Sequence, residues 1–496
     1  MKNLLHSFFL FLDYTANGCY NDSNHSIVES IQIYREVLHM RAGFAEREYT
    51  PAEGIVPGQI EVNYAVGQRT PLMAHVAIIE SQNIGTVLVS LDILFASTAF
   101  ITKLRNRIRQ ITGISVERIL IACTHTHTGC AIDCDVWAFR GDPSYMTEIE
   151  EQTIAAVTTA WENLEEVQLG TATGYDARFN FCRDWYTTDG YIVMNPGFKH
   201  RDKLVKPYAA VDHTVNVMRV DDLQGKPKCL IVNYANHLDT TQATDGMKFG
   251  ADYAGYLRRA LQKEYGEDVT VLFLNGCCAN VNHYDYGNHY CRGAHCRPNV
   301  IPAEEIGNGL AETVKNICPP PVTHAADIRI EGISRKQLIS RRKATRAHKE
   351  WALKTQEAIR AGKDVHTRER ILVDTYLNED PSIPNTMDIE ISVLQIGDWV
   401  IVGLPGEIYS DIGLKIKANS PFANTVIVEI ANGYHGYISP DIIQRAGNYE
   451  GIYSTVAYTG LGSADALING ATDMLYALYY ADNQASLGGL RDKPLD

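Results

Sequence analysis

The chain has 496 residues, of which 45% are hydrophobic and 21% charged, an ordinary composition for a globular protein with a sizeable core. Its formal net charge is −14 at pH 7, so its surface repels phosphate backbones, which argues against nucleic acid as a partner. No stretch of the sequence approaches the ~20 apolar residues that a membrane-spanning helix needs.

The N-terminal segment differs from the rest of the sequence. We expect residues 1–39 to be a leader or disordered segment ahead of one catalytic domain over residues 40–496. Lys2 and the apolar run Leu4–Leu12 resemble a short signal peptide, although His6 and Ser7 dilute that run. We expect a cytoplasmic protein, with a secreted protein or a lipoprotein as the alternative if residues 1–19 are a signal peptide.

The cysteines do not predict a disulfide framework. There are 11 of them, an odd number, in a long chain, whereas disulfide-stapled scaffolds are short. We expect reduced, partly buried thiols, including the adjacent Cys277 and Cys278. The alternative is a second metal site or a redox pair around Cys291 and Cys296, which flank His295.

Short apolar stretches alternate with amphipathic ones over most of the chain. In Phe100–Ile111, for example, the apolar side chains recur every three or four residues, as on one face of a helix. In chain order the pattern predicts a strand at Thr86–Leu94, the helix at Phe100–Ile111, a strand at Arg118–Cys123, a helix at Tyr145–Leu164, a strand at Cys229–His237, a helix at Asp252–Gly266, a strand at Val269–Gly276, a hairpin at Asp388–Glu407 and a strand at Asn424–Tyr434. This alternation predicts an α/β (mixed α+β) fold with central mixed sheets covered by helices.

The interval 335–370 is rich in lysine and arginine. We expect a basic helical insertion whose charged face is solvated, and the alternative is a contact with an anionic surface.

Residue types that bind metals or catalyse reactions follow four of the predicted strands. They are His125 and His127, His237, Glu407, and the pair Tyr434 and Tyr437. Loops at the carboxyl ends of strands converge in open α/β sheets, so these side chains can share one pocket. In an extended segment, His125 and His127 would face one cleft, with Thr124, Thr126 and Thr128 on the other side.

Three histidines and a glutamate would suit a zinc site, because zinc binds imidazole nitrogen and carboxylate oxygen. A catalytic zinc keeps a position open for water and lowers the pKa of that water toward ~7. Each piece also has a structural interpretation: the His-x-His pair as incidental, His237 as a hydrogen-bonded core residue, and Glu407 as a charge at a helix N-terminus.

Several stretches, in the same order along the chain, resemble the neutral, or alkaline, ceramidase family over about residues 41–480. They are Arg41–Gly54 (RAGFAEREYTPAEG), Ser90–Leu94 (SLDIL), Thr124–Gly129 (THTHTG), Asn233–His237 (NYANH), Ala251–Tyr256 (ADYAGY), Leu404–Glu407 (LPGE), Tyr434–Ser439 (YHGYIS) and Asn448–Gly451 (NYEG). The resemblance is to the N-terminal catalytic domain of that family only.

The resemblance implies a zinc-dependent amidohydrolase of sphingolipid metabolism, in which zinc-bound water attacks the amide carbonyl of an N-acyl lipid. By motif position, the implied zinc ligands are His125, His237, Glu407 and Tyr437. His127 would stabilise the oxyanion, and Arg183 would lie near the substrate. The implied partner is a small-molecule or lipid-like substrate.

One departure from the family concerns Asn282, in the stretch NGCCANVNH, which stands where the family has a serine that lines the site. An asparagine donates a hydrogen bond to an oxyanion but cannot act as a nucleophile. Two alternatives therefore stay open. One is a metal-dependent hydrolase of a carbohydrate derivative, acting by deacylation or by lactone or glycoside cleavage, and the other is a catalytically inactive metal-binding homologue.

Overall fold

The computed structural model describes residues 40–57, 63–132, 142–240, 247–287, 301–318 and 328–486. Residues from Met40 onward form one compact unit. The expected leader over residues 1–39 lies outside the described residues, as does the group Cys291, His295 and Cys296 that was considered as a second metal site. The division into a leader and one catalytic domain stays a prediction.

A mixed eight-stranded sheet forms the larger half of the fold. In spatial order its strands are β14 (Thr270–Asn275), β13 (Pro227–Tyr234), β12 (Thr214–Asp222), β7 (Glu165–Tyr175), β1 (Arg41–Glu48), β4 (Met73–Ser81), β5 (Ile84–Leu91) and β6 (Ile119–Cys123). The edge pairs β13–β14 and β5–β6 are parallel, and the central pairs are antiparallel. The two parallel edges each have a crossover helix, as such pairs require.

A four-stranded sheet forms the other half, in the order β16 (Ile330–Ser340), β17 (Thr386–Ile396), β18 (Trp399–Leu404) and β20 (Asn424–Glu429). The pair β17–β18 is the predicted antiparallel hairpin, whereas β18 and β20 run parallel. Three strand pairs and one three-stranded sheet complete the described strands: β2 (Glu53–Val56) with β3 (Asn63–Val66), β8 (Phe181–Cys182) with β15 (Val281–Asn282), β19 (Glu407–Ile408) with β21 (Tyr437–Ile438), and β9 (Asp184–Thr187) between β10 (Ile192–Met194) and β11 (Leu204–Pro207).

The two sheets pack face to face through one apolar layer. Leu88, Leu120 and Ile231 of the larger sheet share this layer with Trp399 and Ile401 of the smaller one, and all are at most 1% exposed. Apolar side chains of the larger sheet's other face pack against α3 (Thr98–Thr112), α4 (Pro143–Glu162), α5 (Asp252–Tyr265) and α6 (Ala303–Ile317). Those of the smaller sheet pack against α9 (Ser410–Asn419) and α11 (Ser463–Ser486).

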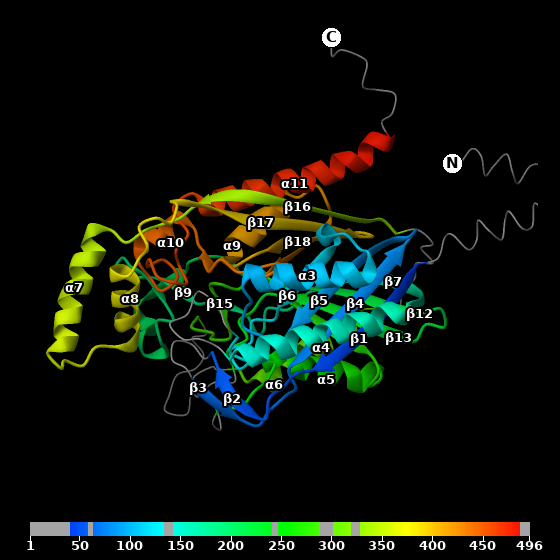
Figure 1. The fold of residues 1–496 in the computed structure, drawn as a ribbon, viewed down its shortest axis with the longest axis horizontal. Coiled ribbons are helices and arrows are strands. Elements are labelled where there is room, and N and C mark those ends of the chain that lie inside the picture. The colour runs from blue at the N-terminus through cyan, green and yellow to red at the C-terminus, as the bar shows by residue number, and fades with distance from the viewer. Residues whose placement is uncertain are drawn as a thin grey trace, which may run out of the picture. The chain divides into compact units, whose positions relative to one another are not determined.

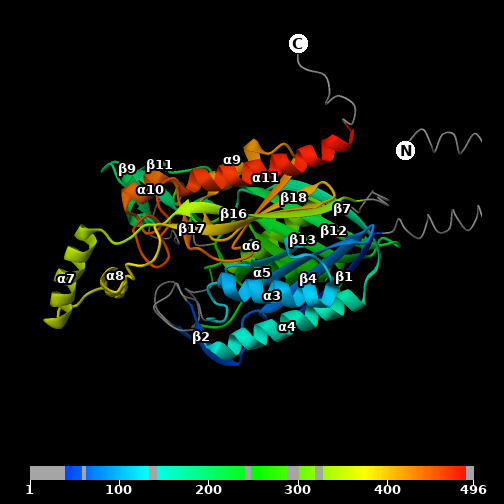
Figure 2. The same cartoon turned by 45° about the horizontal axis from the view of Figure 1, so that its top comes forward.

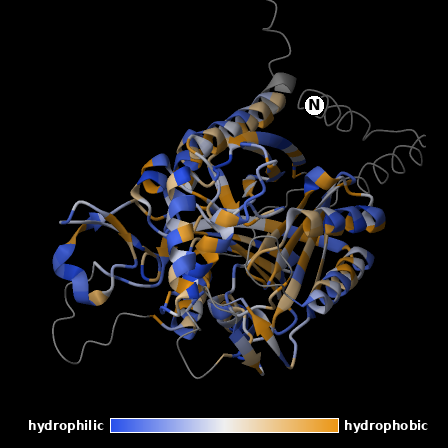
Figure 3. Cartoon of the chain, turned by 60° about the vertical axis from the view of Figure 1, so that its left-hand side comes forward, coloured by the Kyte–Doolittle hydropathy of each residue, from blue (hydrophilic) through white to orange (hydrophobic). Residues whose placement is uncertain are grey.

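The result is a helix–sheet–sheet–helix arrangement, which Figures 1 and 2 show with α11 along β16 and β17, and with α3 and α4 beside the larger sheet. Figure 3 shows the same division by hydropathy: the central strands are mainly hydrophobic, and the helices carry their hydrophilic residues outward. This confirms the predicted mixed α/β fold with helices covering central sheets. Within the described residues, no helix is both long enough and apolar enough to cross a membrane.

Sequence signals account for both ends of α3. The N-cap residue Ser97 accepts a hydrogen bond from the Phe100 amide at 3.2 Å, and Gly113 ends α3 in the left-handed conformation with φ 72°. The helices predicted at 100–111, 145–164 and 252–266 are present as α3, α4 and α5.

The basic interval 335–370 is helical only in part, which corrects the expectation. Its first residues, to Ser340, belong to β16, because the whole strand pairs in register with β17. The helices α7 (Arg346–Arg360) and α8 (Thr367–Leu377) then follow. The lysine and arginine of this segment thus lie partly on an edge strand, where charged side chains discourage pairing with other chains.

The cysteines that the structure describes are all free thiols and all buried: Cys123, Cys130, Cys182, Cys229, Cys277, Cys278 and Cys318. Burial raises the pKa of Cys123, Cys277 and Cys278, so these thiols stay protonated near neutral pH. For these positions the expectation of reduced thiols holds.

Candidate metal centre

The strand-end residues come together at one end of the two sheets. His125 and His127 follow β6 of the larger sheet, and His237 follows β13. Glu407 lies in β19, just after β18 of the smaller sheet, and pairs in parallel register with Tyr437 of β21. The two sheets are joined beside this point, where the Asn432 amide donates to the Ile121 carbonyl at 2.8 Å.

The backbone around His125 is not extended, contrary to the expectation. β6 ends at Cys123, and His125 takes the left-handed conformation with φ 72°, which is strained for a residue with a side chain. His125 and His127 nevertheless line one cavity. The threonines do not line that cavity: Thr126 and Thr128 both donate to the Gly250 carbonyl, at 2.6 and 2.9 Å.

Two imidazoles and a carboxylate converge on one point. His125 Nε2 lies 3.3 Å from His237 Nε2, and Glu407 Oε2 lies 3.4 Å from the former and 3.7 Å from the latter. The three side chains are between 1% and 4% exposed. Glu407 Oε2 has no hydrogen-bond donor among the described residues.

The Nδ1 atoms of His125 and His237 fix the orientation and the tautomer of the two rings. His125 Nδ1 lies 2.9 Å from the Leu94 carbonyl, and His237 Nδ1 lies 2.8 Å from the Cys278 carbonyl. A carbonyl oxygen only accepts, so each Nδ1 carries the proton and each Nε2 lone pair points at the other and at Glu407. Three converging lone-pair donors repel one another unless a proton or a metal cation lies among them, and two imidazole nitrogens with a carboxylate oxygen are donors that fit a metal ion.

His127 is the third histidine of this group. The ligating nitrogens of His125, His127 and His237 lie within 4.8 Å of one another, and all three side chains are buried. The rings of His125 and His127 meet edge to face, with centroids 5.0 Å apart. His127 is therefore close enough either to complete a metal site or to contact what the metal binds.

The pKa shifts follow from this convergence. Burial would raise the pKa of Glu407, but His125 and His237 together hold it well below its usual range. Burial would lower the pKa of His125, but Glu407 raises it overall. Burial, Arg183 and His125 all lower the pKa of His237. At neutral pH the site therefore combines a carboxylate with a neutral His237, the protonation states that metal ligands need.

Tyr437 and Arg183 border the same point. Arg183 Nη2 donates to the Tyr437 hydroxyl at 3.3 Å, and Nη1 lies 3.4 Å from His237 Nε2. Tyr434 donates its hydroxyl proton to Glu407 Oε1 at 2.7 Å, which orients the carboxylate. Arg183, which the resemblance placed near the substrate, thus lies next to the predicted ligands.

Asn282 does not line the cavity formed by the described residues. Its side-chain amide donates to Asn195 Oδ1 at 2.8 Å, and Asn195 lines the cavity. The Asn195 backbone is held in turn by the Arg183 carbonyl, at 2.8 Å. Asn282 therefore sits one residue behind the cavity wall, where it positions Asn195.

Sequence reasoning missed two buried glutamates. Glu450 pairs with Arg183, and Glu429 accepts from the Ile408 and Cys278 amides at 2.8 and 3.0 Å, which places it behind both Glu407 and His237. Glu450 lies within the NYEG motif, to which the sequence pattern assigns no role. Glu429 lies within the strand predicted at 424–434, ends β20 and is completely buried, but a glutamate in this position carries no sequence signal of burial.

The cavity at the centre has a volume of ≈ 100 Å³. Its lining is part polar and part apolar, and it comes from both sheets and from α8. The lining residues are Leu94, Phe95, His125, His127, Arg183, Met194, Asn195, His237, Asp239, Arg368, Glu407, Tyr437, Tyr449 and Val456.

Comparison with known proteins gives a structural match without a sequence match. No family model matches the chain, and neither does any curated protein. The solved structure of neutral ceramidase from Pseudomonas aeruginosa is similar, with a TM-score of 0.65 at 17% identity, over 89% of this chain and 75% of that one. A solved ceramidase complexed with C2 gives a TM-score of 0.64 at 16% identity, over 89% and 76% of the two chains. The structural resemblance that the motifs implied is thus confirmed at the level of the fold.

Proposed function

We propose that this chain is a metal-dependent hydrolase that cleaves the amide bond of an N-acyl compound. The observation that carries the proposal is the convergence of His125 Nε2, His237 Nε2 and Glu407 Oε2 within 3.7 Å, with both Nδ1 atoms committed to backbone carbonyls. The shared fold with ceramidases, whose name denotes hydrolysis of an N-acyl lipid, supports the reaction class.

His125, His237 and Glu407 would hold the metal, with Tyr437 beside Glu407 as the fourth ligand. Nitrogen and oxygen donors of this kind suit Zn²⁺. A bound zinc would supply a Lewis acid and would lower the pKa of a water molecule in the site. Tyr434 would hold Glu407 in its ligating orientation through the hydrogen bond to Oε1.

The remaining residues would act on the carbonyl group. His127 faces the same cavity as the proposed ligands, so an imidazolium or neutral N–H there would donate to the developing oxyanion. Arg183 adds a fixed positive charge next to Tyr437. Asn282 holds Asn195 against the cavity, and it does so without a nucleophilic hydroxyl, so the proposed reaction proceeds by direct attack of water on the carbonyl carbon.

The test has two readouts. The first is metal content by elemental analysis after zinc loading and gel filtration, comparing wild type with His125→Ala, His237→Ala and Glu407→Gln, and with His200→Ala, an exposed histidine, as the matched control. We expect about one zinc per chain in wild type and in the control, and a loss of it in the other three variants.

The second readout is hydrolysis by the zinc-loaded protein of N-acyl lipids, N-acetylated sugars, O-acetylated sugars and lactones. Release of amine from an N-acyl substrate that depends on His125 supports the proposal. Zinc binding without turnover of any of these would favour the inactive homologue, and turnover of esters or lactones alone would favour the carbohydrate-directed alternative.

A further inference from the structure

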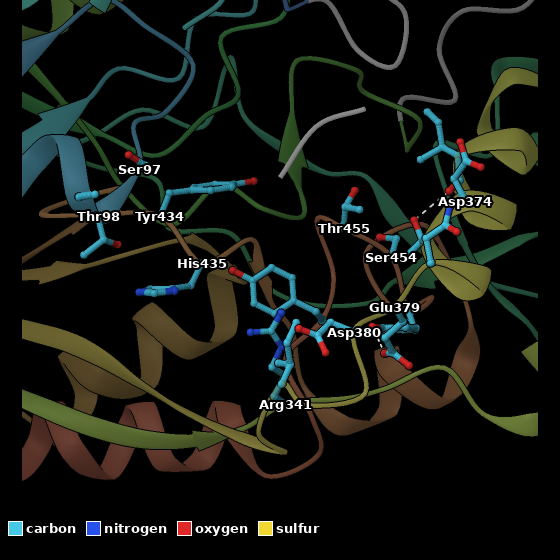
Figure 4. A pocket seen from close by; sticks show the side chains of 17 residues that line it. Ser97, Thr98, Arg341, Asp374, Glu379, Asp380, Tyr434, His435, Ser454 and Thr455 are labelled. Atoms are coloured by element: carbon cyan, nitrogen blue, oxygen red, sulfur yellow. Dashed lines mark hydrogen bonds between the residues drawn. The ribbon is translucent and has the colours of Figure 1, made fainter. Parts of the chain in front are cut away.

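A second and larger cavity lies next to the candidate metal centre. Its volume is ≈ 860 Å³, within the range of cavities that bind small molecules. The N-terminal end of α3 forms one wall, α8 and the loop after it form another, and residues 453–458 with Tyr434 and His435 form the floor. Figure 4 shows side chains from these segments facing one another across the cavity.

The lining combines polar and apolar surface, and its charged groups include an excess of hydrogen-bond acceptors. Three carboxylates, of Asp374, Glu379 and Asp380, face one guanidinium, of Arg341. Asp374 and Asp380 are exposed to the cavity and the solvent beyond it, whereas Glu379 accepts a hydrogen bond from Tyr453. The aliphatic side chains of the lining are Ile371, Ile383 and Ala99, and further apolar surface comes from the tyrosine rings, so the cavity has no continuous aliphatic groove for an acyl chain.

The floor is formed by tyrosines, by Ser454 and Thr455, and by His435. Tyr434, Tyr453 and Tyr458 line it, and the Arg341 guanidinium lies 5.0 Å from the centroid of the Tyr458 ring. His435 lines the cavity as well, and its imidazole nitrogens form hydrogen bonds with polar ligands.

One hydroxyl of the floor lacks a partner. Ser454 is 8% exposed and lines the cavity, and its Oγ makes no hydrogen bond to any described residue. Buried hydroxyls are nearly always hydrogen-bonded in folded proteins, so an unsatisfied one at a cavity wall points to a polar ligand.

The two cavities share a wall. Tyr434 lines the larger cavity and donates to Glu407 at the metal centre, and its ring stacks on Phe95, which lines the smaller cavity, with centroids 4.0 Å apart. Thr455 lines the larger cavity, and the next residue, Val456, lines the smaller one. A ligand in the larger cavity would therefore lie beside the proposed reaction centre.

We propose that the large cavity binds a polyhydroxylated, carbohydrate-like group. Surplus carboxylate acceptors match hydroxyl donors, and tyrosine rings pack against the C–H face of a sugar ring, whereas an anionic or long apolar group finds no complement there. The identity of the ligand rests on the function proposed above: the carbohydrate-like group would be the polar part of the N-acylated substrate, as in an N-acylated amino sugar. Binding itself does not depend on that function.

The test measures binding to the full chain, without turnover, by saturation-transfer NMR and calorimetry. The probes are N-acetylglucosamine, glucosamine and glucose, with octanoate as the apolar probe. We expect saturable binding of at least one saccharide and none of octanoate. The double variant Asp374→Asn/Asp380→Asn should weaken saccharide binding at least 10-fold with an unchanged thermal midpoint, and Ser454→Ala should weaken it several-fold. Asp364→Asn, an exposed aspartate between α7 and α8, is the matched control and should change nothing.

The outcome is separable from that of the hydrolase proposal, because His237→Ala should abolish hydrolysis while leaving saccharide affinity within about twofold. Absence of saturable saccharide binding by the wild-type chain would overturn the inference. So would affinity that is unaffected by the aspartate and serine substitutions, or a preference for octanoate.

Discussion

Arg183 and Glu450 form a buried ion pair at the back of the candidate metal centre. Arg183 Nη2 lies 2.8 Å from Glu450 Oε1, Nε donates to the same oxygen at 2.9 Å, and the two side chains are 6% and 0% exposed. The same guanidinium also contacts Tyr437 and His237, so the ion pair holds Arg183 against two of the residues proposed to bind the metal.

We expect Glu450→Gln to lower the free energy of unfolding by about 3 kcal/mol, since it leaves the Arg183 charge buried without compensation. Denaturant unfolding of the metal-free protein measures this. The double variant Arg183→Met/Glu450→Gln should recover most of the loss, because neither charge then remains. The single variant Arg183→Met completes the comparison. If the loss of unfolding free energy in the double variant equals the sum of the losses in the two single variants, the ion pair has no such coupling.

Tyr434→Phe should weaken zinc retention by about 10–100-fold while the fold is kept, because the hydroxyl that orients Glu407 is removed. Competition with a chelator of known affinity measures the change. Tyr376→Phe is the control, since the Tyr376 hydroxyl donates to a backbone carbonyl of Tyr453, away from the metal centre. Equal zinc affinity in the two variants would exclude this orienting role for Tyr434.

Trp399→Ala should cost about 3–5 kcal/mol of unfolding free energy, because Trp399 is fully buried in the layer between the two sheets. Trp351→Ala offers a comparison, because Trp351 on α7 is only partly buried and belongs to a small separate cluster. We expect it to cost less than half as much. Similar losses at the two sites would contradict a core centred between the sheets.

The Asp212–Lys417 ion pair should make stability depend on pH in acid. The Lys417 Nζ atom lies 2.6 Å from Asp212 Oδ2. Burial acts to raise the pKa of Asp212, but Lys417 and Thr214 lower it overall. A folded pKa below the unfolded value of ~3.9 means that this contribution is complete above about pH 5 and is lost as the pH falls. Unfolding free energies measured between pH 3 and pH 6 should fall less steeply in Asp212→Asn than in wild type, and an identical slope would refute this.

Local sequence patterns predicted the elements of the fold well. The apolar runs at 118–123, 229–237 and 269–276 correspond to β6, β13 and β14. Strands that are buried on both faces consist of nearly continuous apolar residues, which makes them easy to recognise in the sequence. The first two of these runs, together with the hairpin predicted at 388–407, placed His125, His237 and Glu407 at strand ends. The prediction of a helix over the whole interval 335–370 was wrong for its first residues, because lysine and arginine suit an exposed edge strand as well as a helix.

What the patterns could not supply is the packing of one sheet on the other. That packing brings Glu407 and Tyr437, on the β19–β21 pair that follows the smaller sheet's strands, to the histidines of the larger sheet, and no periodicity encodes which faces meet. The left-handed backbone at His125 depends on tertiary hydrogen bonds, such as that of its amide to the Ile93 carbonyl. The burial of Glu429 and Glu450 depends on partners more than a hundred residues away in the chain.

The most direct test of the central claim is anomalous X-ray diffraction from crystals of the zinc-loaded protein, with data collected on both sides of the zinc absorption edge. We expect one strong peak bonded to His125 Nε2, His237 Nε2 and Glu407 Oε2, at ligand distances of about 2.0–2.2 Å. A density map with no anomalous peak among these three atoms, or with the zinc held elsewhere in the chain, would contradict the proposed metal centre.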